Sequence, residues 1–314
     1  GVWAMYKPLT PEELKKVEKA KGKSSKDTVY RKVVGIMTVY VDDCVIACLT
    51  QTMLDYEISR INAKHPLTII TQTTNPDGSK SFDLCGCDVT IHSKMRTLKM
   101  CMANYTKKLL TRFDMNSAKP VPTPNFDEAV LHNKLSKPMP DFPFREVVGS
   151  LQWLATTCRP DISHSTNTLA RASANVVTKA MANCARRIMR YLVGTIYWSI
   201  NYSPEIEEKF MKDHQELTSH EENLNKIDKN LFTCAIHTFS DASFGVAYIT
   251  LRSVSGAIIY LYGCPISWKC KMQTVTTGST MESEYVAAAD ALELSSNVHG
   301  LQNFMLGIPE TEET

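Results

Sequence analysis

The tetrapeptide Tyr40-Val41-Asp42-Asp43 stands between two apolar runs, residues 33–39 and 45–49. The runs predict two strands, and the tetrapeptide predicts the turn that joins them. Two adjacent carboxylates are unusual there, because tight hairpins favour Asn-Gly or Asp-Gly and because neighbouring like charges repel. A divalent cation removes that repulsion, and magnesium prefers hard oxygen ligands. The pattern favours a metal site on a hairpin; the alternative is two solvated aspartates in an ordinary loop.

Short motifs on both sides of this hairpin form a series whose order and spacing are more specific than any one motif. In chain order they are Asp27-Thr28-Val29-Tyr30, Phe82-Asp83-Leu84-Cys85-Gly86, Asn104-Tyr105, Lys107-Lys108-Leu109-Leu110, Arg112-Phe113-Asp114-Met115, Val121-Pro122-Thr123-Pro124, Phe144-Arg145, Val148-Gly149-Ser150-Leu151, Arg159-Pro160-Asp161-Ile162, Arg190-Tyr191-Leu192-Val193-Gly194-Thr195, Ser240-Asp241-Ala242-Ser243 and Ser279-Thr280-Met281-Glu282-Ser283-Glu284-Tyr285. With the hairpin, the series resembles the carboxyl-terminal part of the pol polyprotein of copia-type LTR retrotransposons. The resemblance covers about residues 27–309.

The resemblance implies a mixed α+β and α/β fold: a partial reverse-transcriptase palm, a helical thumb–connection, and a truncated ribonuclease H-like α/β domain. A chain of 314 residues with 43% hydrophobic residues is long and apolar enough for two cores. The expected parts are a basic helix and connector (1–32), partial palm and start of thumb (33–118), Pro-rich connector (119–143), thumb–connection (144–203), acidic linker (204–230) and truncated ribonuclease H-like domain (231–314).

Sequence patterns also predict individual elements. Expected helices are 10–19, 54–63, 102–115, several within 144–193, and 282–294. Besides the first hairpin, a second is expected between 67–72 and 81–91, turning at Asn75-Pro76-Asp77-Gly78. Later strands are expected at 231–240, 247–262 and 266–269.

For the polymerase half, the resemblance implies RNA-directed DNA synthesis by nucleotidyl transfer with two Mg²⁺ (or Mn²⁺) ions. Asp42 and Asp43 match the metal-binding acids; Asp42 is the firmer ligand and Asp43 assists. Tyr40 either lies near the primer end or is an aromatic residue of the palm core. Phe82-Asp83-Leu84-Cys85-Gly86 occupies the place of the family's F-L-G turn. Cys85 departs from the family, which has Leu or a similar apolar residue before the turn glycine, and this puts the geometry that grips the primer in doubt.

For the ribonuclease H half, the resemblance implies hydrolysis of the RNA strand of an RNA–DNA hybrid, again with metal ions. Asp241 matches the first catalytic acid and Glu284 the second, which opens a helix facing it. Glu282 is the competing assignment, but Glu284-Tyr285-Val286-Ala287 fits the family's E-x-x-A pattern better.

Both metal sites are expected to be incomplete in this chain. The family's other palm acid should precede Gly1, and the third ribonuclease H acid should lie roughly 35 residues beyond Glu284, whereas Thr314 lies 30 beyond it. The expected function is therefore that of a fragment, inactive alone, whose partners are an RNA template, a DNA primer, RNA–DNA hybrid and the missing polyprotein parts. Two alternatives stay open: a non-catalytic nucleic-acid-binding remnant of a retroelement, and, more weakly, an autonomous nuclease.

Basic residues are the expected contacts to nucleic acid. The resemblance places the thumb–connection beside the template–primer, with Lys107, Lys108, Arg112, Arg145, Arg159 and Arg190 as candidates. Residues 15–32 form a further Lys-rich segment. For each of these, the alternative is a charge on a solvated helix face.

Composition excludes other classes. The ten cysteines lack zinc-site spacing and are expected to be reduced thiols. No apolar run approaches the roughly 20 residues of a membrane helix. An intracellular protein is expected, either cytoplasmic in a particle or nuclear, with no membrane partner.

Overall fold

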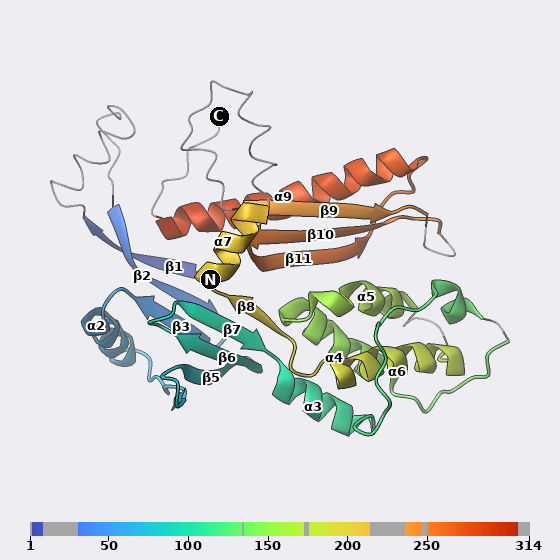
Figure 1. The fold of residues 1–314 in the computed structure, drawn as a ribbon, viewed down its shortest axis with the longest axis horizontal. Coiled ribbons are helices and arrows are strands. Elements are labelled where there is room, and N and C mark those ends of the chain that lie inside the picture. Colours follow the sequence, from blue (N-terminus) through green and yellow to red (C-terminus); the bar gives the residue numbers. More distant parts are fainter. Residues whose placement is uncertain are drawn as a thin grey trace. The chain divides into compact units, whose positions relative to one another are not determined.

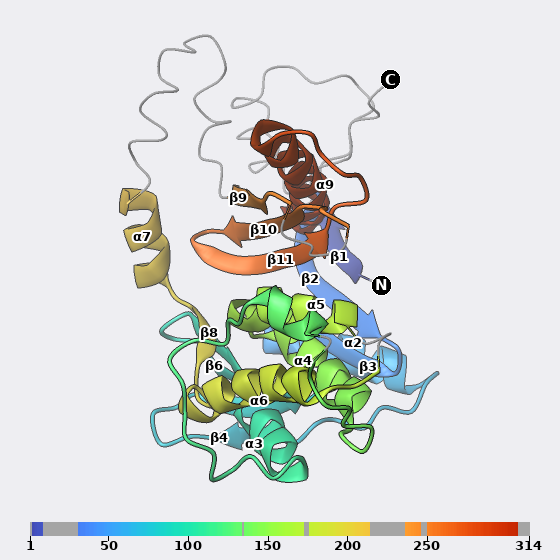
Figure 2. The same ribbon diagram turned by 90° about the vertical axis from the view of Figure 1, so that its right-hand side faces the viewer.

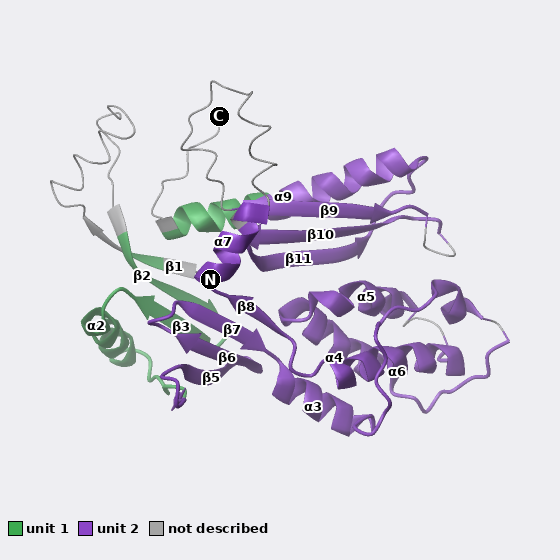
Figure 3. Ribbon diagram, viewed as in Figure 1, with its two compact units in different colours: residues 1–70, 296–314 green, residues 71–295 purple. Residues whose placement is uncertain are grey.

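The computed structural model describes residues 2–8, 31–133, 135–172, 176–213, 236–245 and 250–306 (Figure 1). The expected helix at 10–19 and the motif Asp27-Thr28-Val29-Tyr30 lie outside these residues. The chain divides into two compact units, residues 1–70 with 296–314 and residues 71–295 (Figure 3). None of the described helices has the length and apolarity of a membrane span.

The first unit contains a three-stranded antiparallel sheet. Its strands are β1 (Val2–Pro8), β2 (Arg31–Tyr40) and β3 (Asp43–Cys48), in that order across the sheet. The predicted hairpin is confirmed, because β2 pairs with β3 from Gly35–Cys48 to Tyr40–Asp43. The helix α2 (Gln51–Asn62) follows at once, and the Thr50 side chain caps it by accepting a hydrogen bond from the Met53 amide.

The second unit contains a five-stranded antiparallel sheet in the order β4 (Thr73–Thr74), β5 (Lys80–Leu84), β6 (Cys87–His92), β7 (Thr97–Cys101) and β8 (Ser199–Tyr202). The second predicted hairpin is only partly right. Residues 67–72 are not a strand, and 81–91 is two strands because the chain reverses at Cys85 and Gly86, where φ is 51° and 82°. Two successive positive φ values suit a tight hairpin turn.

Helices between β7 and β8 cover this sheet and supply most of the core. They are α3 (Ala103–Arg112), η1 (Glu128–His132), α4 (Phe144–Thr157), η2 (Pro160–Ile162), α5 (Ser163–Arg171) and α6 (Lys179–Gly194), which confirms the predicted helical region. Leu110, Leu151 and Leu192 are fully buried in one cluster with sheet residues Val89 and Ile200. Apolar residues at helical spacing thus join helices and sheet into one core.

The segment expected to begin an acidic linker starts with a helix instead, α7 (Pro204–Asp213). Proline suits the first helical turn, where its missing N–H is not needed. The Ser203 hydroxyl accepts from the Ile206 amide, and Glu205 and Glu207 favour the helix dipole. The acidic segment therefore begins with a helix, and the linker expected over residues 204–230 stays a prediction, because residues 214–230 lie outside the described residues.

The later strands and helix form a second, three-stranded antiparallel sheet in the order β11 (Cys264–Met272), β10 (Val254–Leu261), β9 (Ile236–Ser243), with the helix α9 (Thr280–Leu306) after it. The part of α9 in the second unit lies along this sheet (Figure 2), and Thr238 Oγ1 is 3.0 Å from Ser295 Oγ. The opposite face meets α4 and α5, because Trp268 Nε1 donates to the Ala155 carbonyl and Asn167 Nδ2 to the Cys270 carbonyl.

A first prediction tests this core. Replacing Leu151, which is 0% exposed, with alanine should lower the free energy of unfolding by about 2–5 kcal/mol, the cost of lost burial plus a cavity. Chemical denaturation would measure it. The matched change Leu135→Ala, at a position 94% exposed, should cost less than about 0.5 kcal/mol. Equal effects of both changes would contradict the assigned core.

Candidate functional site

The β2–β3 hairpin displays two carboxylates on a strained turn. Tyr40 pairs with Asp43, so Val41 and Asp42 alone make the turn. Val41 has φ of 56°, a left-handed conformation that a β-branched residue rarely adopts and that glycine usually fills at this turn position. Such strain costs of the order of 1–3 kcal/mol and persists where the surrounding structure enforces it. Asp42 and Asp43 are exposed at the tip.

The two hairpin carboxylates are oxygen ligands of the kind that a hard cation takes. Magnesium takes six oxygen ligands, and adjacent carboxylates can supply some of them while other positions stay open for phosphate oxygens or water. Within the described residues, no three or more His, Cys, Asp or Glu side chains converge on one possible metal position. Tyr40, beside the acids, is 64% exposed and so is not the core aromatic that one interpretation predicted.

The two acids assigned to ribonuclease H are not brought together. Strand β9 pairs with β10 without a register shift, so side chains alternate regularly between the faces of the sheet. Thr238 meets Ser295 of α9, and Asp241, three residues on, therefore points to the other face. There it lines a cavity of about 360 Å³ with His164 and Trp268. Glu284 is exposed on α9, so the expectation that it faces Asp241 is not met.

The basic candidates on the helices differ in their surroundings. Lys107, Lys108 and Arg145 are exposed. Arg112 is also exposed but pairs with Glu146 at 2.6 Å, a contact that contributes little in water. Arg190 is half-buried and its Nε donates to the Lys119 carbonyl at 2.6 Å. The two lysines of α3 are therefore the candidates whose charges are most available to a phosphate.

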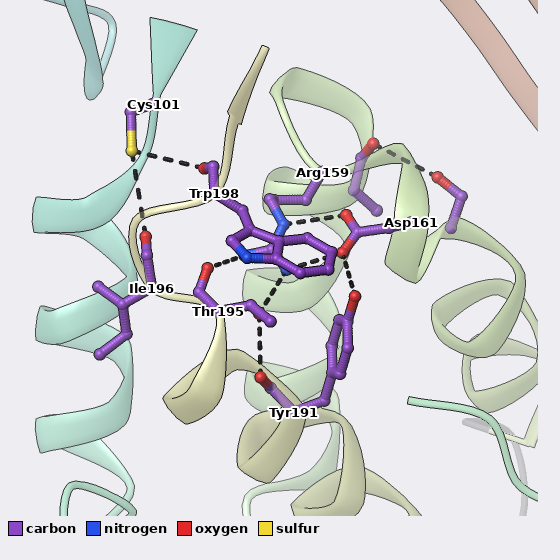
Figure 4. A network of polar contacts seen from close by, with 9 residues as sticks. Cys101, Arg159, Asp161, Tyr191, Thr195, Ile196 and Trp198 are labelled. Atoms are coloured by element: carbon purple, nitrogen blue, oxygen red, sulfur yellow. Dashed lines mark hydrogen bonds and ion pairs between the residues drawn. The ribbon is translucent and has the colours of Figure 1, made fainter. Parts of the chain in front are cut away.

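Arg159 lies in a network of polar contacts with Asp161 and Thr195 (Figure 4). It is 3% exposed, and its guanidinium makes a two-point contact with Asp161 at 2.9 and 2.7 Å. Two further donors reach the carbonyl and the hydroxyl of Thr195, at 2.9 and 2.7 Å. The assignment of Arg159 to nucleic-acid contact is therefore corrected. Its planar guanidinium matches the Asp161 carboxylate two residues away, and its donors are taken up by hydrogen bonds inside the protein.

Tyr191 completes this buried network, which the sequence did not reveal. Its hydroxyl donates to Asp161 Oδ2 at 2.8 Å, and its carbonyl accepts from the Thr195 hydroxyl at 2.9 Å. Burial, together with the hydrogen bond to the Asp161 carboxylate, raises the pKa of Tyr191 to about 12. The nine described cysteines are free thiols; burial raises the pKa of Cys184 to about 11, which makes it unreactive.

Comparisons with known proteins agree with the motif series. The chain is 31% identical over 258 residues to the Retrovirus-related Pol polyprotein from transposon RE2 of Arabidopsis thaliana, and 29% identical over 259 residues to that from transposon RE1. It is 27% identical over 234 residues to that from transposon TNT 1-94 of Nicotiana tabacum. These matches cover 81%, 81% and 68% of the chain.

The chain spans only about 15% of the length of each of these three relatives. No protein-family model and no solved structure matches it. The sequence is thus related to retroelement proteins. More particularly, the chain is a homologue of one segment of the Pol polyproteins of copia-type retrotransposons, as the motifs indicated.

A second prediction concerns Tyr191. Tyr191→Phe should lower the free energy of unfolding at pH 8 by about 1.5–3 kcal/mol, because a buried hydrogen bond to a carboxylate is lost. Since the folded-state pKa is raised, this contribution is complete below pH 10 and is lost as the pH rises through about 12. Urea denaturation from pH 8 to 12 should show the difference between wild type and variant shrinking.

The exposed Tyr56 provides the control for this experiment. Tyr56→Phe should change the free energy of unfolding by less than about 0.5 kcal/mol at each pH. A difference between wild type and Tyr191→Phe that stayed constant up to pH 12 would contradict the raised pKa.

Proposed function

We propose that this chain acts as a segment of a retroelement Pol polypeptide that copies RNA into DNA and cleaves the RNA strand of the resulting hybrid. The β2–β3 hairpin carries the proposal: two adjacent, exposed carboxylates on a turn whose first residue is held at positive φ. Kinship with Pol polyproteins supports it. The partners would be an RNA template, a DNA primer, RNA–DNA hybrid and other segments of the polypeptide.

In this proposal the hairpin supplies oxygen ligands for divalent ions, Mg²⁺ or Mn²⁺. When bound, a pair of such ions would lower the pKa of the attacking hydroxyl and stabilise the leaving pyrophosphate. Asp42, in the turn itself, is the principal ligand, and Asp43 assists from the first position of β3. Tyr40, exposed on the last position of β2, lies beside them and could contact the primer end.

Other segments are needed because the described residues do not bring three acids together. A two-ion site depends on carboxylates from more than one strand, as the resemblance implies, and the hairpin provides one strand pair. For ribonuclease H, Asp241 and Glu284 remain proposed ligands on the strength of their motifs. In this structure Asp241 lies on the sheet face away from α9, and Glu284 is exposed on α9. We therefore propose that the 314 residues alone catalyse neither reaction.

A second candidate function is non-catalytic binding of nucleic acid. The exposed lysines of α3 favour it, because such charges neutralise phosphates whatever the state of the carboxylate sites. This binding would be independent of sequence and would weaken steeply with salt.

The third prediction tests the hairpin directly. Adding Mn²⁺ to the labelled protein should broaden the amide NMR signals of residues 40–44, because the paramagnetic ion binds beside them. Asp42→Asn keeps the size of the side chain, removes its charge, and should weaken the Mn²⁺ affinity about tenfold or more. Asp55→Asn, at an exposed position of α2, is the matched control and should leave the broadening unchanged. Broadening that survives Asp42→Asn would count against the metal site.

The fourth prediction tests catalysis. On an RNA template with a DNA primer, the chain alone should show no magnesium-dependent extension. A fusion that replaces the 258 matched residues of the RE2 polyprotein with those of this chain should extend the primer, and Asp42→Asn should abolish the extension. A folded fusion without activity would contradict the polymerase proposal, and efficient extension by the chain alone would contradict the need for other segments.

A further inference from the structure

Two large aromatic side chains are exposed to solvent in the connection between α6 and β8. Tyr197 is 68% exposed and Trp198 is 56% exposed. Neither was singled out from the sequence, because the motif before them ends at Thr195. Exposed single aromatics are common, but two in succession on an ordered connection, in contact with a cation, need an explanation.

Contacts with the side chains of Tyr191 and Arg159 hold Trp198 in place (Figure 4). Its ring meets the Tyr191 ring edge to face, with centroids 6.0 Å apart, and the Arg159 guanidinium lies 5.8 Å from its centroid. Its backbone is fixed as well, since its amide donates to the Thr195 carbonyl and its carbonyl accepts from Cys101 Sγ. The buried network therefore orients the indole, and more than half of the residue's surface stays open to a ligand.

The ammonium group of Lys107 lies over the Tyr197 ring. Lys107 Nζ lies 4.9 Å from the Tyr197 ring centroid. Among the described residues, neither Lys107 nor its neighbour Lys108 makes an ion pair, so both charges can meet an anion. The arrangement sets an aromatic surface next to an ammonium group.

Three acids of the second unit already have hydrogen-bond or ion-pair partners. Asp161 is committed to Arg159 and Tyr191. Asp88 accepts from the Asn104 backbone amide and side-chain amide at 3.2 and 2.6 Å. Glu146, farther along, is paired with Arg112. Asp161 and Glu146 are thus each paired with an arginine, whereas Lys107, at the Tyr197 ring, has no ion-pair partner among the described residues.

We propose that Trp198 and Tyr197 form a platform on which successive bases of single-stranded nucleic acid stack, with Lys107 and Lys108 contacting the phosphates. Stacking of a base on an aromatic side chain is tolerant of sequence, and each such contact strengthens binding by about 5- to 150-fold. The platform deepens the proposed function, since it rests on that function for its ligand, a single-stranded template or primer. A purely apolar partner would not need the lysines, and a folded acidic protein would not need open ring faces.

The experiment measures binding of fluorescein-labelled oligouridine and oligothymidine, each twelve nucleotides long, to the full 314-residue chain by fluorescence anisotropy. Trp198→Ala should weaken binding by about 5- to 150-fold, and Trp198→Phe should restore most of it. Tyr197→Ala, which removes no buried contact, should weaken binding similarly. Tyr56→Ala, at another exposed aromatic, is the matched control and should bind like wild type.

The salt dependence separates stacking from charge. Trp198→Ala should leave the slope of log affinity against log salt unchanged. Lys107→Gln should make that slope shallower by the amount that corresponds to about one phosphate contact. Comparing the two oligonucleotides distinguishes an RNA from a DNA ligand. The platform would be overturned if Tyr197→Ala and Trp198→Ala, both folded by circular dichroism, bound like wild type, or if neither oligonucleotide bound at low salt.

This outcome is independent of the hairpin test. If Asp42→Asn leaves the Mn²⁺ broadening unchanged while Trp198→Ala weakens binding as expected, the proposed catalytic role fails and the platform stands. If the hairpin binds Mn²⁺ and both aromatic variants bind like wild type, the platform alone fails.

Discussion

The second unit depends on the pairing of one buried cation. Arg159 lies between α4 and η2, and its guanidinium bonds Asp161 on one side and Thr195, at the end of α6, on the other. Removing one partner from a buried pair typically costs about 3–5 kcal/mol, since it leaves a charge without compensation. The network thus fixes where α6 ends relative to α4. The same contacts fix the position of the connection that leads from α6 into strand β8.

The sequence predicted the elements whose signals are local. The β2–β3 hairpin, α3 and the helices from Phe144 onward follow from periodic apolar residues and breakers that lie within a few positions of one another. The start of α7 was missed because acidic residues can begin a helix as readily as they fill a linker. The turn at Cys85 and Gly86 split an apparent strand, and one glycine among β-forming residues does not distinguish a bulge from a reversal.

The candidate site was predictable only where chain neighbours create it. Asp42 and Asp43 are adjacent, so one turn displays both. Arg159 and Lys107 are both basic residues within helical regions, yet one is buried and the other exposed, because Thr195, 36 residues away, completes the pocket for the first. The face on which Asp241 lies depends on strand register, and a slip of one residue would reverse it.

Strand β8 has a consequence for how the chain is made. It closes the edge of β7, but Ser199 follows Cys101 only after α3 to α6, a separation of about 100 residues. At a synthesis rate of about 5–20 residues per second, that edge stays open for roughly 5–20 seconds after β7 leaves the ribosome. During this interval β7 presents unpaired backbone groups, a template for pairing with another chain. Nascent copies are therefore exposed to mispairing at this edge until β8 is complete.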